Sequence, residues 1–589
     1  MTTSTPLPTS ERPRALDDES LCAAFQRTAA ERPDDVALAD ARHPAGISWH
    51  DYGERVRRLA EGLHSLGLRR GDTLALLLTN RVEFHLFDAA AIHLGAVPFS
   101  VYTTSAPEQV EYLLRDSGAR VVVTENALQE RLAQALELGE RRLDALVVVD
   151  GENGALNLDE LELCGSPELD FEASWRAVRA DDVLTLIYTS GTTGAPKGVE
   201  LTHGNLLAAW RSMYAAWGLP RPGSTTISYL PSAHVADRFG CHYAGMLFGA
   251  AITSCGDPRQ VGKALPEVRP TVFAAVPRIW QKLKAGVEAA IGAETDDARR
   301  QAMGWALETG LRVVDLEQRG EPVPQGLRAE LARADELVLS GIRQRLGLDR
   351  CELAVCAAAP VPPEVLSFHQ ALGLPIIELY GLSETSAVAT ANRPGHQRIG
   401  TVGRAAPGVE LRLADDGEVL LRGDVLMRGY RNRPDKTGEA IDGDGWLHTG
   451  DVGVLDEDGY LRIVDRKKEL IINAAGKNMS PANIESTIKA ASGLVGQACV
   501  IGDARPYNVA LLTPDAEASA RLTPEALHAE IAAAVERANE RLSRVEQIKR
   551  FHLLDRDWLP GGVELTPTMK LKRRAIAKRY ADEIERLYA

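Results

Sequence analysis

A loop rich in glycine and hydroxyl side chains, followed by a lysine, is the first place where this sequence could do chemistry. An apolar run, Leu186–Tyr188, leads into Thr189, Ser190, Gly191, Thr192, Thr193, Gly194 and Lys197. Glycines let backbone N–H groups approach an anion, hydroxyls donate further hydrogen bonds, and lysine adds compact positive charge. The pattern predicts a phosphate loop, although composition alone leaves a polar surface loop equally open. A P-loop kinase or ATPase is excluded, because Gly198 stands where that motif needs Ser or Thr.

A second polar cluster follows a predicted strand, Ile376–Tyr380. The strand ends in Tyr380 and Gly381, and Glu384 and Thr385 come shortly after. Ligands of open parallel sheets bind outside the carboxyl ends of the strands, so these residues should face a crevice. Glu384 offers the hard oxygen atoms that Mg²⁺ prefers. Taken alone, a glutamate in a turn is more often simply solvated.

Charged residues nearer the C-terminus form two more clusters. Asp451, in the segment GWLHTGD, has a carboxylate suited to accepting hydrogen bonds from ribose hydroxyls, and the basic run Arg466–Lys468 follows it. Further on, a turn rich in Pro and Thr presents Lys570 before a basic helix. Basic runs of this kind are usually solvated surface, so neither cluster predicts a site by itself.

The order and identity of these segments together resemble the adenylate-forming superfamily of acyl-CoA synthetases, luciferases and peptide-synthetase adenylation domains. The resemblance extends from about Leu21 to the C-terminus. It rests on five segments in sequence order: YTSGTTGAPKG, YGLSET, GWLHTGD, DRKKELIINAAGKNMSP and PTMKLKRR. It implies that a carboxylate attacks the α-phosphate of ATP to give an acyl-adenylate and pyrophosphate, and that a thiol then displaces AMP.

The resemblance also implies a role for each matching residue. The loop Thr189–Lys197 is expected to bind the β- and γ-phosphates, Glu384 and Thr189 to position Mg²⁺, and Lys570 to bridge the carboxylate and the α-phosphate. Lys468 matches the hinge about which a small C-terminal domain turns between the two steps, and Gly476 lies in the loop that serves the second step. The expected nucleotide contacts are Tyr380, Gly381, Thr385 and Ala358, in the turn Ala357–Pro360, for adenine, and Asp451 and Arg466 for ribose.

One stretch, YLPSAHVADRF, resembles the long-chain fatty-acid branch of the superfamily. It makes His234 an expected residue of the acyl pocket and of the catalytic geometry, although a lone histidine is more often structural. A long-chain fatty acid is the expected substrate and coenzyme A the expected acceptor. A fatty acyl-AMP ligase that loads an acyl-carrier protein stays open, as does a lipid- or nucleotide-binding relative without catalysis.

One departure from the superfamily lies at Ala357–Ala358, where relatives often carry two glycines. The added methyl groups either narrow the acyl tunnel or merely pack against neighbouring backbone. The sequence leaves both possibilities open.

Short apolar runs alternate with helical patterns through most of the chain, which predicts an α/β fold with βαβ-built sheets. Strands are expected at Thr73–Leu78, Arg120–Val123, Ala145–Val149, Val183–Tyr188, Thr271–Val276, Leu353–Val355 and Ile376–Tyr380. After Gly400, alternating valine-rich segments predict a small antiparallel region. The expected organisation is a disordered lead-in (1–17), a large AMP-binding domain (18–465) with a helical insertion (282–346), and a small mobile α+β lid (466–589).

Composition limits the partners of the chain. Its 589 residues include 67 Lys and Arg against 82 Asp and Glu, a formal net charge of −15, which argues against nucleic-acid binding. No apolar run is long enough for a transmembrane helix. Seven cysteines without a C-x-x-C pair fit reduced thiols in the cytoplasm. A fatty-acid substrate partitions into membranes, so peripheral membrane contact stays open, and the oligomeric state is unknown.

Overall fold

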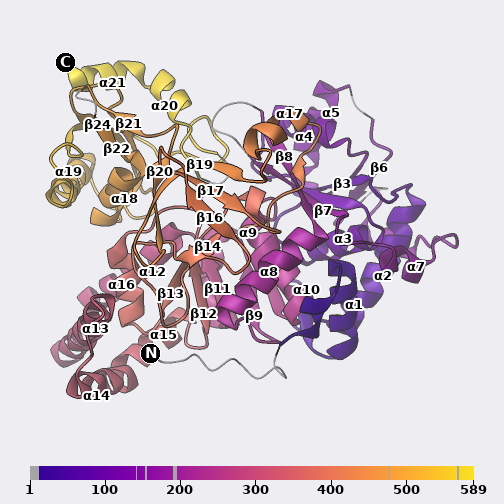
Figure 1. Ribbon diagram of the computed structural model, residues 1–589, viewed down its shortest axis with the longest axis horizontal. Coiled ribbons are helices and arrows are strands. Elements are labelled where there is room, and N and C mark those ends of the chain that lie inside the picture. Colours follow the sequence, from indigo (N-terminus) through magenta and orange to yellow (C-terminus); the bar gives the residue numbers. More distant parts are fainter. Residues whose placement is uncertain (1–11, 141, 153–154, 190–194, 475–476, 567–568) are drawn as a thin grey trace.

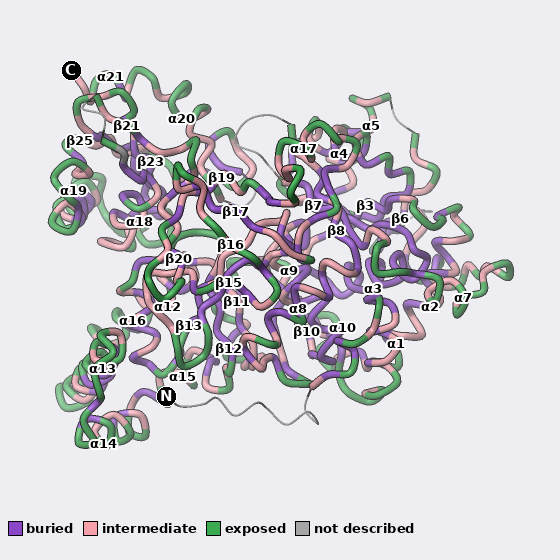
Figure 2. Tube along the Cα trace, in the orientation of Figure 1, coloured by how far each residue is buried: buried purple, intermediate pink, exposed green. Residues whose placement is uncertain are grey.

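The computed structural model of the chain describes all residues except 1–11, 141, 153–154, 190–194, 475–476 and 567–568. Figure 1 shows the sheets of the N-terminal two thirds side by side, with the C-terminal segment as a separate yellow cap above them. Figure 2 shows that buried residues concentrate along the strands and the helices between them, whereas α13 and α14 are largely exposed at the periphery. The α/β fold predicted from the alternating pattern is confirmed.

A parallel sheet of four strands builds one side of the large part of the molecule. Its order is β4-β3-β5-β6, and every neighbouring pair is parallel. Helix α3 is buried along its whole length, including Glu83, His85, Asp88 and His93, which interrupt an otherwise apolar sequence. The bounds are β3 (Thr73–Leu77), α3 (Val82–His93), β4 (Val97–Ser100), α4 (Pro107–Ser117), β5 (Val121–Thr124), α5 (Gln129–Leu138) and β6 (Ala145–Val148).

A second sheet, in the order β2-β1-β10-β9, joins the N-terminus of the chain to its middle. Strand β1 pairs in parallel with β10, more than 200 residues away, so this sheet cannot form before both parts of the chain exist. The bounds of its strands and of the helices around it are α1 (Leu21–Glu31), β1 (Val36–Ala39), β2 (Ile47–Ser48), α2 (Trp49–Ser65), α6 (Leu158–Leu163), α7 (Phe171–Arg176), α8 (His203–Trp217), β9 (Thr225–Ser228), α9 (Val235–Asp237), η4 (Arg238–Tyr243), α10 (Ala244–Phe248) and β10 (Ala251–Ser254).

The third sheet, β11-β12-β13-β14-β15, is parallel over its first three strands and antiparallel over the last two. Its parallel strands end on the side where the cluster after Tyr380 begins. The bounds are α11 (Val261–Val268), β11 (Val272–Ala275), β12 (Leu353–Cys356), α16 (Pro363–Ala371), β13 (Ile376–Tyr380), η7 (Ser383–Thr385), β14 (Thr390–Ala391) and β15 (Arg404–Ala405).

Two antiparallel sheets complete the large part of the molecule. The alternating valine-rich segments after Gly400 predict one of them. One has the order β16-β17-β19-β20 and the other β18-β8-β7. The bounds are β7 (Val183–Thr189), β8 (Lys197–Thr202), β16 (Glu410–Leu413), β17 (Glu418–Arg422), β18 (Gly429–Tyr430), α17 (Pro434–Ala440), β19 (Leu447–Leu455) and β20 (Leu461–Arg466).

Residues 282–346 lie in helices attached to the edge of the third sheet. Helix α12 starts at Pro277, directly after β11, and the fully buried Trp280 fixes its first turn by donating from Nε1 to the carbonyl of Val355 (3.3 Å). The following helices pack on α16. The bounds are α12 (Pro277–Ala293), α13 (Asp297–Gln318), α14 (Gln325–Ala334), η6 (Asp335–Leu339) and α15 (Ser340–Leu346).

The C-terminal segment has hydrophobic clusters of its own, built on the sheet β23-β24-β25. Helices α18 and α19 cover the cluster around Ile484, and α20 and α21 cover the one around Trp558. The bounds are β21 (Ile471–Ile472), β22 (Asn478–Met479), α18 (Pro481–Ala491), β23 (Val495–Ile501), β24 (Asn508–Pro514), α19 (Pro524–Arg541), β25 (Ile548–Leu553), α20 (Arg573–Arg579) and α21 (Ala581–Tyr588).

The structure differs from the expected disordered lead-in at residues 12–17. A short 3-10 helix, η2 (Arg14–Asp17), is formed there, and Ala15 and Leu16 are buried in the main core. Arg211 of α8 donates from Nε to the carbonyl of Leu16 (2.6 Å), which fixes the segment. Long-range packing therefore orders a stretch whose local composition is polar. In the described part of the chain, no helix combines the length and apolarity needed to cross a bilayer.

Buried histidines make the stability of this fold depend on pH. His369, on α16, donates from Nδ1 to the carbonyl of Val365 (2.8 Å) and makes an edge contact with Trp280. Burial lowers the pKa of His369 from 6.5 to about 4. Between these values the unfolded chain binds a proton that the folded chain does not, so His369 favours folding at higher pH and loses that contribution as the pH falls.

We expect His369→Gln to weaken this dependence. The slope of the unfolding free energy against pH, between pH 4 and 6.5, should become less positive by up to about 1.4 kcal/mol per pH unit. Urea titrations at several pH values measure the slope directly. An unchanged slope would mean that His369 is protonated in the folded protein.

Candidate active site

The two ends of the predicted phosphate loop face each other across a hairpin. Strands β7 and β8 pair in antiparallel register, which sets Thr189 opposite Lys197. Ser190, Gly191, Thr192, Thr193 and Gly194 lie outside the described residues. Thr202 then caps α8 by accepting from the backbone N–H of Asn205 (3.1 Å).

Lys197 lies against an aromatic ring that links it to Glu384. Its ammonium is 3.8 Å from the centre of the Tyr430 ring, and the Tyr430 hydroxyl donates to Glu384 Oε1 (2.7 Å). Burial lowers the pKa of Lys197, and the nearby Glu384 carboxylate partly opposes this. Tyr430 is a site residue that the sequence reasoning missed. Tyr430 lies in the segment MRGYRNR, which is not part of any of the five motif segments. Only its contacts with Lys197 and Glu384 identify it as a site residue.

Glu384 is held by the turn that follows β13. The Thr385 hydroxyl donates to the carbonyl of Leu382 and accepts from its N–H, and Thr385 is fully buried, so this side chain shapes the turn rather than facing the crevice. Gly381 is needed for close packing, because a Cβ there would stand 2.1 Å from the carbonyl oxygen of Ala387. The turn therefore presents Glu384 in a defined position.

The residues present fit a magnesium ion that is shared with phosphates. No convergent group of three or more His, Cys, Asp or Glu side chains occurs among the described residues, so the protein alone does not build a full coordination shell. Mg²⁺ is commonly held by one or two protein oxygens plus substrate phosphates. Glu384 and the hydroxyl of Thr189, at the ends of β13 and β7, supply oxygens of that kind.

Tyr380, Asp451 and Arg466 meet where two sheets adjoin. The Tyr380 hydroxyl donates to Asp451 Oδ2 (2.6 Å), and Arg466 Nε lies 3.5 Å from Asp451 Oδ1. Asp451 and Arg466 are also register partners across β19 and β20. Burial raises the pKa of Asp451, while Tyr380 and the positive charges of Arg466 and Lys570 oppose this rise. The arrangement leaves a carboxylate and a guanidinium together at the edge of the crevice.

Lys570 reaches this group from the C-terminal segment. Two hydrogen bonds fix its backbone to Thr566: Thr566 N–H donates to the Lys570 carbonyl (2.8 Å) and Lys570 N–H donates to Thr566 Oγ1 (3.0 Å). The pKa of Lys570 is lowered first by lost hydration around the ammonium and then by Arg466, and Asp451 and Glu384 act against the shift. Part of the residue remains exposed to solvent. Lys570 is therefore within electrostatic reach of residues from β19, from β20 and from the turn after β13.

His234 lies on the same side as Lys570. It caps the short helix α9 by accepting from Ala236 N–H at Nδ1 (3.1 Å). Burial, together with a smaller effect of the charge of Lys570, lowers the pKa of His234 to about 4. His234 is therefore neutral at physiological pH, and a positive Lys570 is near enough to influence it.

A buried polar network holds the segment after His234. The Arg238 guanidinium pairs with Asp88 and donates to Tyr243 OH (2.9 Å), and Nε donates to the carbonyl of Ser232 (3.0 Å). His242 Nε2 contacts the other oxygen of Asp88 (2.9 Å). All of these groups are buried. Because Arg238 binds the backbone two residues before His234, the network fixes the position of the histidine.

The hinge position lies in an exposed turn after β20. Lys468 has no ion-pair partner among the residues that the structure describes, whereas its neighbour Lys467 is bound to Asp416 and to Glu418 (3.1 Å). The Lys467 N–H also donates to the carbonyl of Gly450 (2.9 Å). The chain is thus anchored up to residue 467 and unpaired at 468. Gly476 lies outside the described residues.

The turn after β12 contains a strained alanine. Ala358 has φ 75°, a left-handed conformation that favours glycine. This is one of the two positions where relatives of the superfamily often carry glycine. The side chain is exposed, so no close packing of the methyl group offsets the strain. The backbone keeps the shape of a glycine turn in spite of the substitution.

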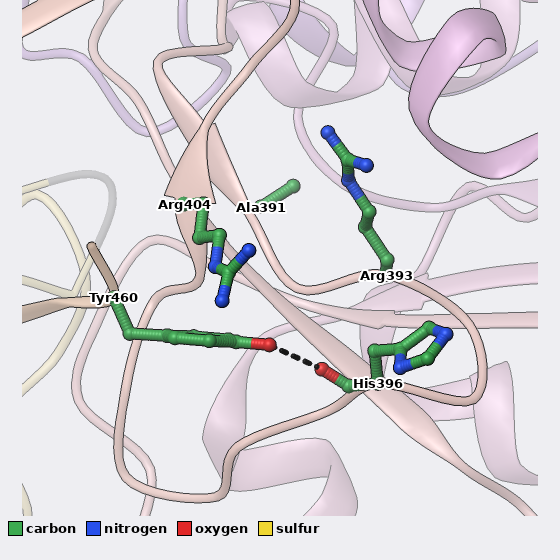
Figure 3. A pocket seen from close by; sticks show the side chains of 5 residues that line it. All are labelled: Ala391, Arg393, His396, Arg404 and Tyr460. Carbon is green, nitrogen blue, oxygen red and sulfur yellow. Dashed lines mark hydrogen bonds between the residues drawn. The ribbon is translucent and has the colours of Figure 1, made fainter. Parts of the chain in front are cut away.

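A separate pocket of about 210 Å³ lies outside this group of residues. It is lined by Ala391, Arg393, His396, Arg404 and Tyr460 (Figure 3). The Tyr460 hydroxyl donates to the carbonyl of His396 (3.1 Å) and the Arg404 guanidinium lies over the Tyr460 ring. None of the predicted site residues lines it, so we leave it out of the candidate active site.

Family models match most of the chain. The model described as AMP-binding enzyme matches residues 25–431, and the model described as AMP-binding enzyme C-terminal domain matches residues 468–589. The chain belongs to the AMP-binding enzyme family. The superfamily resemblance inferred from the five segments is thereby confirmed.

Similar proteins with curated names are fatty-acid–CoA ligases. A candidate fatty-acid–CoA ligase of Mycobacterium tuberculosis, fadD11, is 52% identical over 452 residues, which cover 74% of this chain and 79% of that protein. The long-chain-fatty-acid–CoA ligase FadD15 of Mycobacterium bovis is 37% identical over 561 residues and 92% of each chain. The long-chain-fatty-acid–CoA ligase ACSBG2 of Xenopus laevis is 32% identical over 623 residues, covering 96% of this chain and 83% of that one.

Solved structures share the fold at lower identity. The anthranilate CoA ligase AuaEII, in complex with anthranoyl-AMP, superposes with a TM-score of 0.74 at 21% identity, over 96% of this chain and 98% of that one. The A domain of a carboxylic acid reductase from Segniliparus rugosus gives a TM-score of 0.76 at 19% identity, over 98% and 96%. Both support the fold described above.

The strain at Ala358 can be tested by restoring glycine. Left-handed alanine costs about 1–2 kcal/mol, and the greater flexibility of glycine in the unfolded chain returns about 0.5–1 kcal/mol of that. We therefore expect Ala358→Gly to raise the unfolding free energy by about 0.5–1 kcal/mol, measured by urea denaturation. Ala359→Gly is the matched control, because Ala359 is also exposed but has no positive φ, and it should lower stability. If both variants lose stability, the turn is not strained.

Proposed function

We propose that this chain activates a long-chain fatty acid with ATP and transfers the acyl group to coenzyme A, giving acyl-CoA, AMP and pyrophosphate. The names of the relatives support the substrate and the acceptor. The observation that carries the chemistry is the position of Lys570, whose charge on the C-terminal segment lies within electrostatic reach of Asp451, Arg466 and Glu384. Five segments that are far apart in the sequence would thus each contribute side chains to one site.

The first step joins two anions, so the main task of the site is to neutralise and align charge. We assign the β- and γ-phosphates to the loop that ends at Lys197. The ammonium of Lys197 lies against the Tyr430 ring, which holds this lysine in place. Lys570 then neutralises the fatty-acid carboxylate and the α-phosphate together as the new bond forms. Its lowered pKa reflects a cation kept in a poorly hydrated place, where an approaching pair of anions gains more than it would in water.

The adenosine part of ATP is assigned to the junction of the sheets. Tyr380 and the turn at Ala358 flank the adenine, and Asp451 accepts from the ribose hydroxyls beside Arg466. The hydrogen bond from Tyr380 to Asp451 sets the carboxylate before the nucleotide arrives (2.6 Å). Mg²⁺, held by Glu384, Thr189 and the phosphates, supplies further charge neutralisation when bound.

His234 is assigned to the acyl side of the site. Because it is neutral, it does not compete with Lys570 for the carboxylate, and its fixed ring borders the place where the fatty acid meets the ammonium. Arg238 and Asp88 act through the backbone as positioning residues for this ring.

The second step needs a different arrangement of the C-terminal segment. We propose that residues 466–589 turn as a unit about Lys468, so that Lys570 leaves and the loop containing Gly476 enters. The end of one matched family model at 431 and the start of the next at 468 support a division near this point, as do the separate hydrophobic clusters. An unpaired residue directly after an anchored one is a suitable hinge.

The proposed activity is tested with fatty acids of different length. Exchange of pyrophosphate into ATP should require a fatty acid, and CoA should convert the adenylate to a thioester and AMP. The same assay with an acyl-carrier protein in place of CoA separates the two acceptors. If none of the acids tested supports the exchange, the proposal is contradicted. If the thioester forms only on the carrier protein, the carrier protein replaces CoA as the acceptor.

Lys570→Ala separates the two half-reactions. Loss of a preorganised charge of this kind costs about 10²–10³ in rate, so adenylate formation should fall by that factor. Thioester formation from supplied acyl-adenylate should continue, because that step does not use Lys570. Rapid-quench measurement of each step is decisive, with Lys549→Ala, an exposed lysine of the same segment, as control. An equal fall in both steps would overturn the role of Lys570.

A further inference from the structure

The docked position of the C-terminal segment is marked by charge pairs at helix α12, far from Lys570 in sequence. Arg278 Nη2 lies 2.7 Å from Asp515 Oδ2 and 3.9 Å from Asp557 Oδ2. One turn further along α12, Lys282 Nζ lies 3.3 Å from Glu517 Oε2. We call these five residues the α12 latch. All of its cations belong to the large part of the molecule and all of its carboxylates to the C-terminal segment.

The large side of the latch is rigid. Arg278 is the second residue of α12, between the buried Pro277 and the fully buried Trp280. Trp280 is hydrogen-bonded to Val355 of β12, the strand that leads into the turn at Ala358. The guanidinium is therefore attached to the same framework as the proposed adenine site.

The C-terminal side of the latch is also formed in advance. Asp515 Oδ1 accepts from the N–H groups of Glu517 and Ala518 (both 3.1 Å), which leaves Oδ2 for Arg278. Asp557 Oδ1 accepts from the Thr513 hydroxyl (2.6 Å) and from Trp558 N–H (2.9 Å). Side chains that are already ordered lose little entropy when they pair. The contact can therefore form and break without local refolding.

The members of the latch differ in strength. Lys282 and Glu517 are 51% and 88% exposed, and such pairs contribute little. Arg278 and Asp515 are only 32% and 10% exposed, and their contact is a charge-assisted hydrogen bond. Arg541 and Glu364 form a further pair between the two parts (2.7 Å), but both are well exposed. Arg278 is thus the residue on which the latch depends.

The latch contacts and the placement of Lys570 near the site belong to the same docked position of the C-terminal segment. A turn of the C-terminal segment about Lys468 that removes Lys570 from Asp451 also carries Asp515 and Asp557 away from Arg278. We propose that Arg278 is a positioning residue for adenylation: its pairing with Asp515 and Asp557 holds the C-terminal segment where Lys570 faces the site. This inference rests on the proposed function for its kinetic consequence, whereas the docking itself does not require ATP.

The first experiment measures docking without substrates. Donor and acceptor fluorophores, introduced as unnatural amino acids at the exposed positions Leu138 and Val545, report the distance between the two parts by energy transfer. Arg278→Ala should lower the ratio of docked to undocked molecules about three- to tenfold. Arg278→Lys should retain most of the docking. High salt should bring the unchanged protein toward the Arg278→Ala value, because it screens the charges.

The matched control is Arg221→Ala. It removes an arginine from an ion pair with Glu352 (3.0 Å) that lies entirely within the large part, so docking should be unchanged. Thermal unfolding of every variant checks that none has lost its fold. If Arg278→Ala docks as well as the unchanged protein, or if the control shows the same loss, the proposal is wrong.

The second experiment measures the two half-reactions in single turnovers. Arg278→Ala should slow adenylate formation relative to thioester formation from supplied acyl-adenylate, and Arg278→Lys should restore the ratio. Equal slowing of both steps would indicate a general structural role and overturn the proposal. If the unchanged protein forms no adenylate from any fatty acid, the proposed function fails, while the energy-transfer result still decides whether the latch exists.

Discussion

The hydrogen bond from Tyr380 to Asp451 is the contact on which the rest of the site depends. It joins the end of a parallel strand, β13, to an antiparallel strand, β19, and so fixes two sheets of different origin against each other. Arg466 lies against Asp451, the charge of Lys570 acts on Asp451, and Glu384 takes its position from the turn that follows Tyr380. The positions at which the nucleotide, the metal and the reacting groups would bind are all set by this one junction.

The electrostatics of the chain follow from the same junction. The protein carries a net charge of −15, yet ATP, coenzyme A and a fatty acid are anions. Lys197 and Lys570 both have lowered pKa values because they are held where water is scarce. In each, lost hydration disfavours the charged form more than the nearby carboxylates favour it, so an anionic substrate would offset that cost.

Sequence predicted the fold class and most strands of the parallel sheets, because these follow from local periodicity. It did not predict Tyr430, which acts through Lys197 and Glu384, nor Arg278, which lies in an ordinary helical pattern. Their partners are 46 to more than 200 residues away, and no local signal reports such distances. It also missed the ordering of residues 12–17, since the short helix there packs on α8 and α10, which are distant in the sequence, as well as on α1.

Two successive steps place opposite demands on the interface between the two parts of the molecule. The first step needs Lys570 in a poorly hydrated position near Asp451. The second step needs Lys570 to have left the site. A large apolar interface would secure the first and obstruct the second. Preformed ion pairs, partly exposed to water, give orientation while keeping the free energy of release small. The charge pattern at α12 is therefore suited to an interface that has to open in every cycle, and the modest strength of each pair is part of how it works.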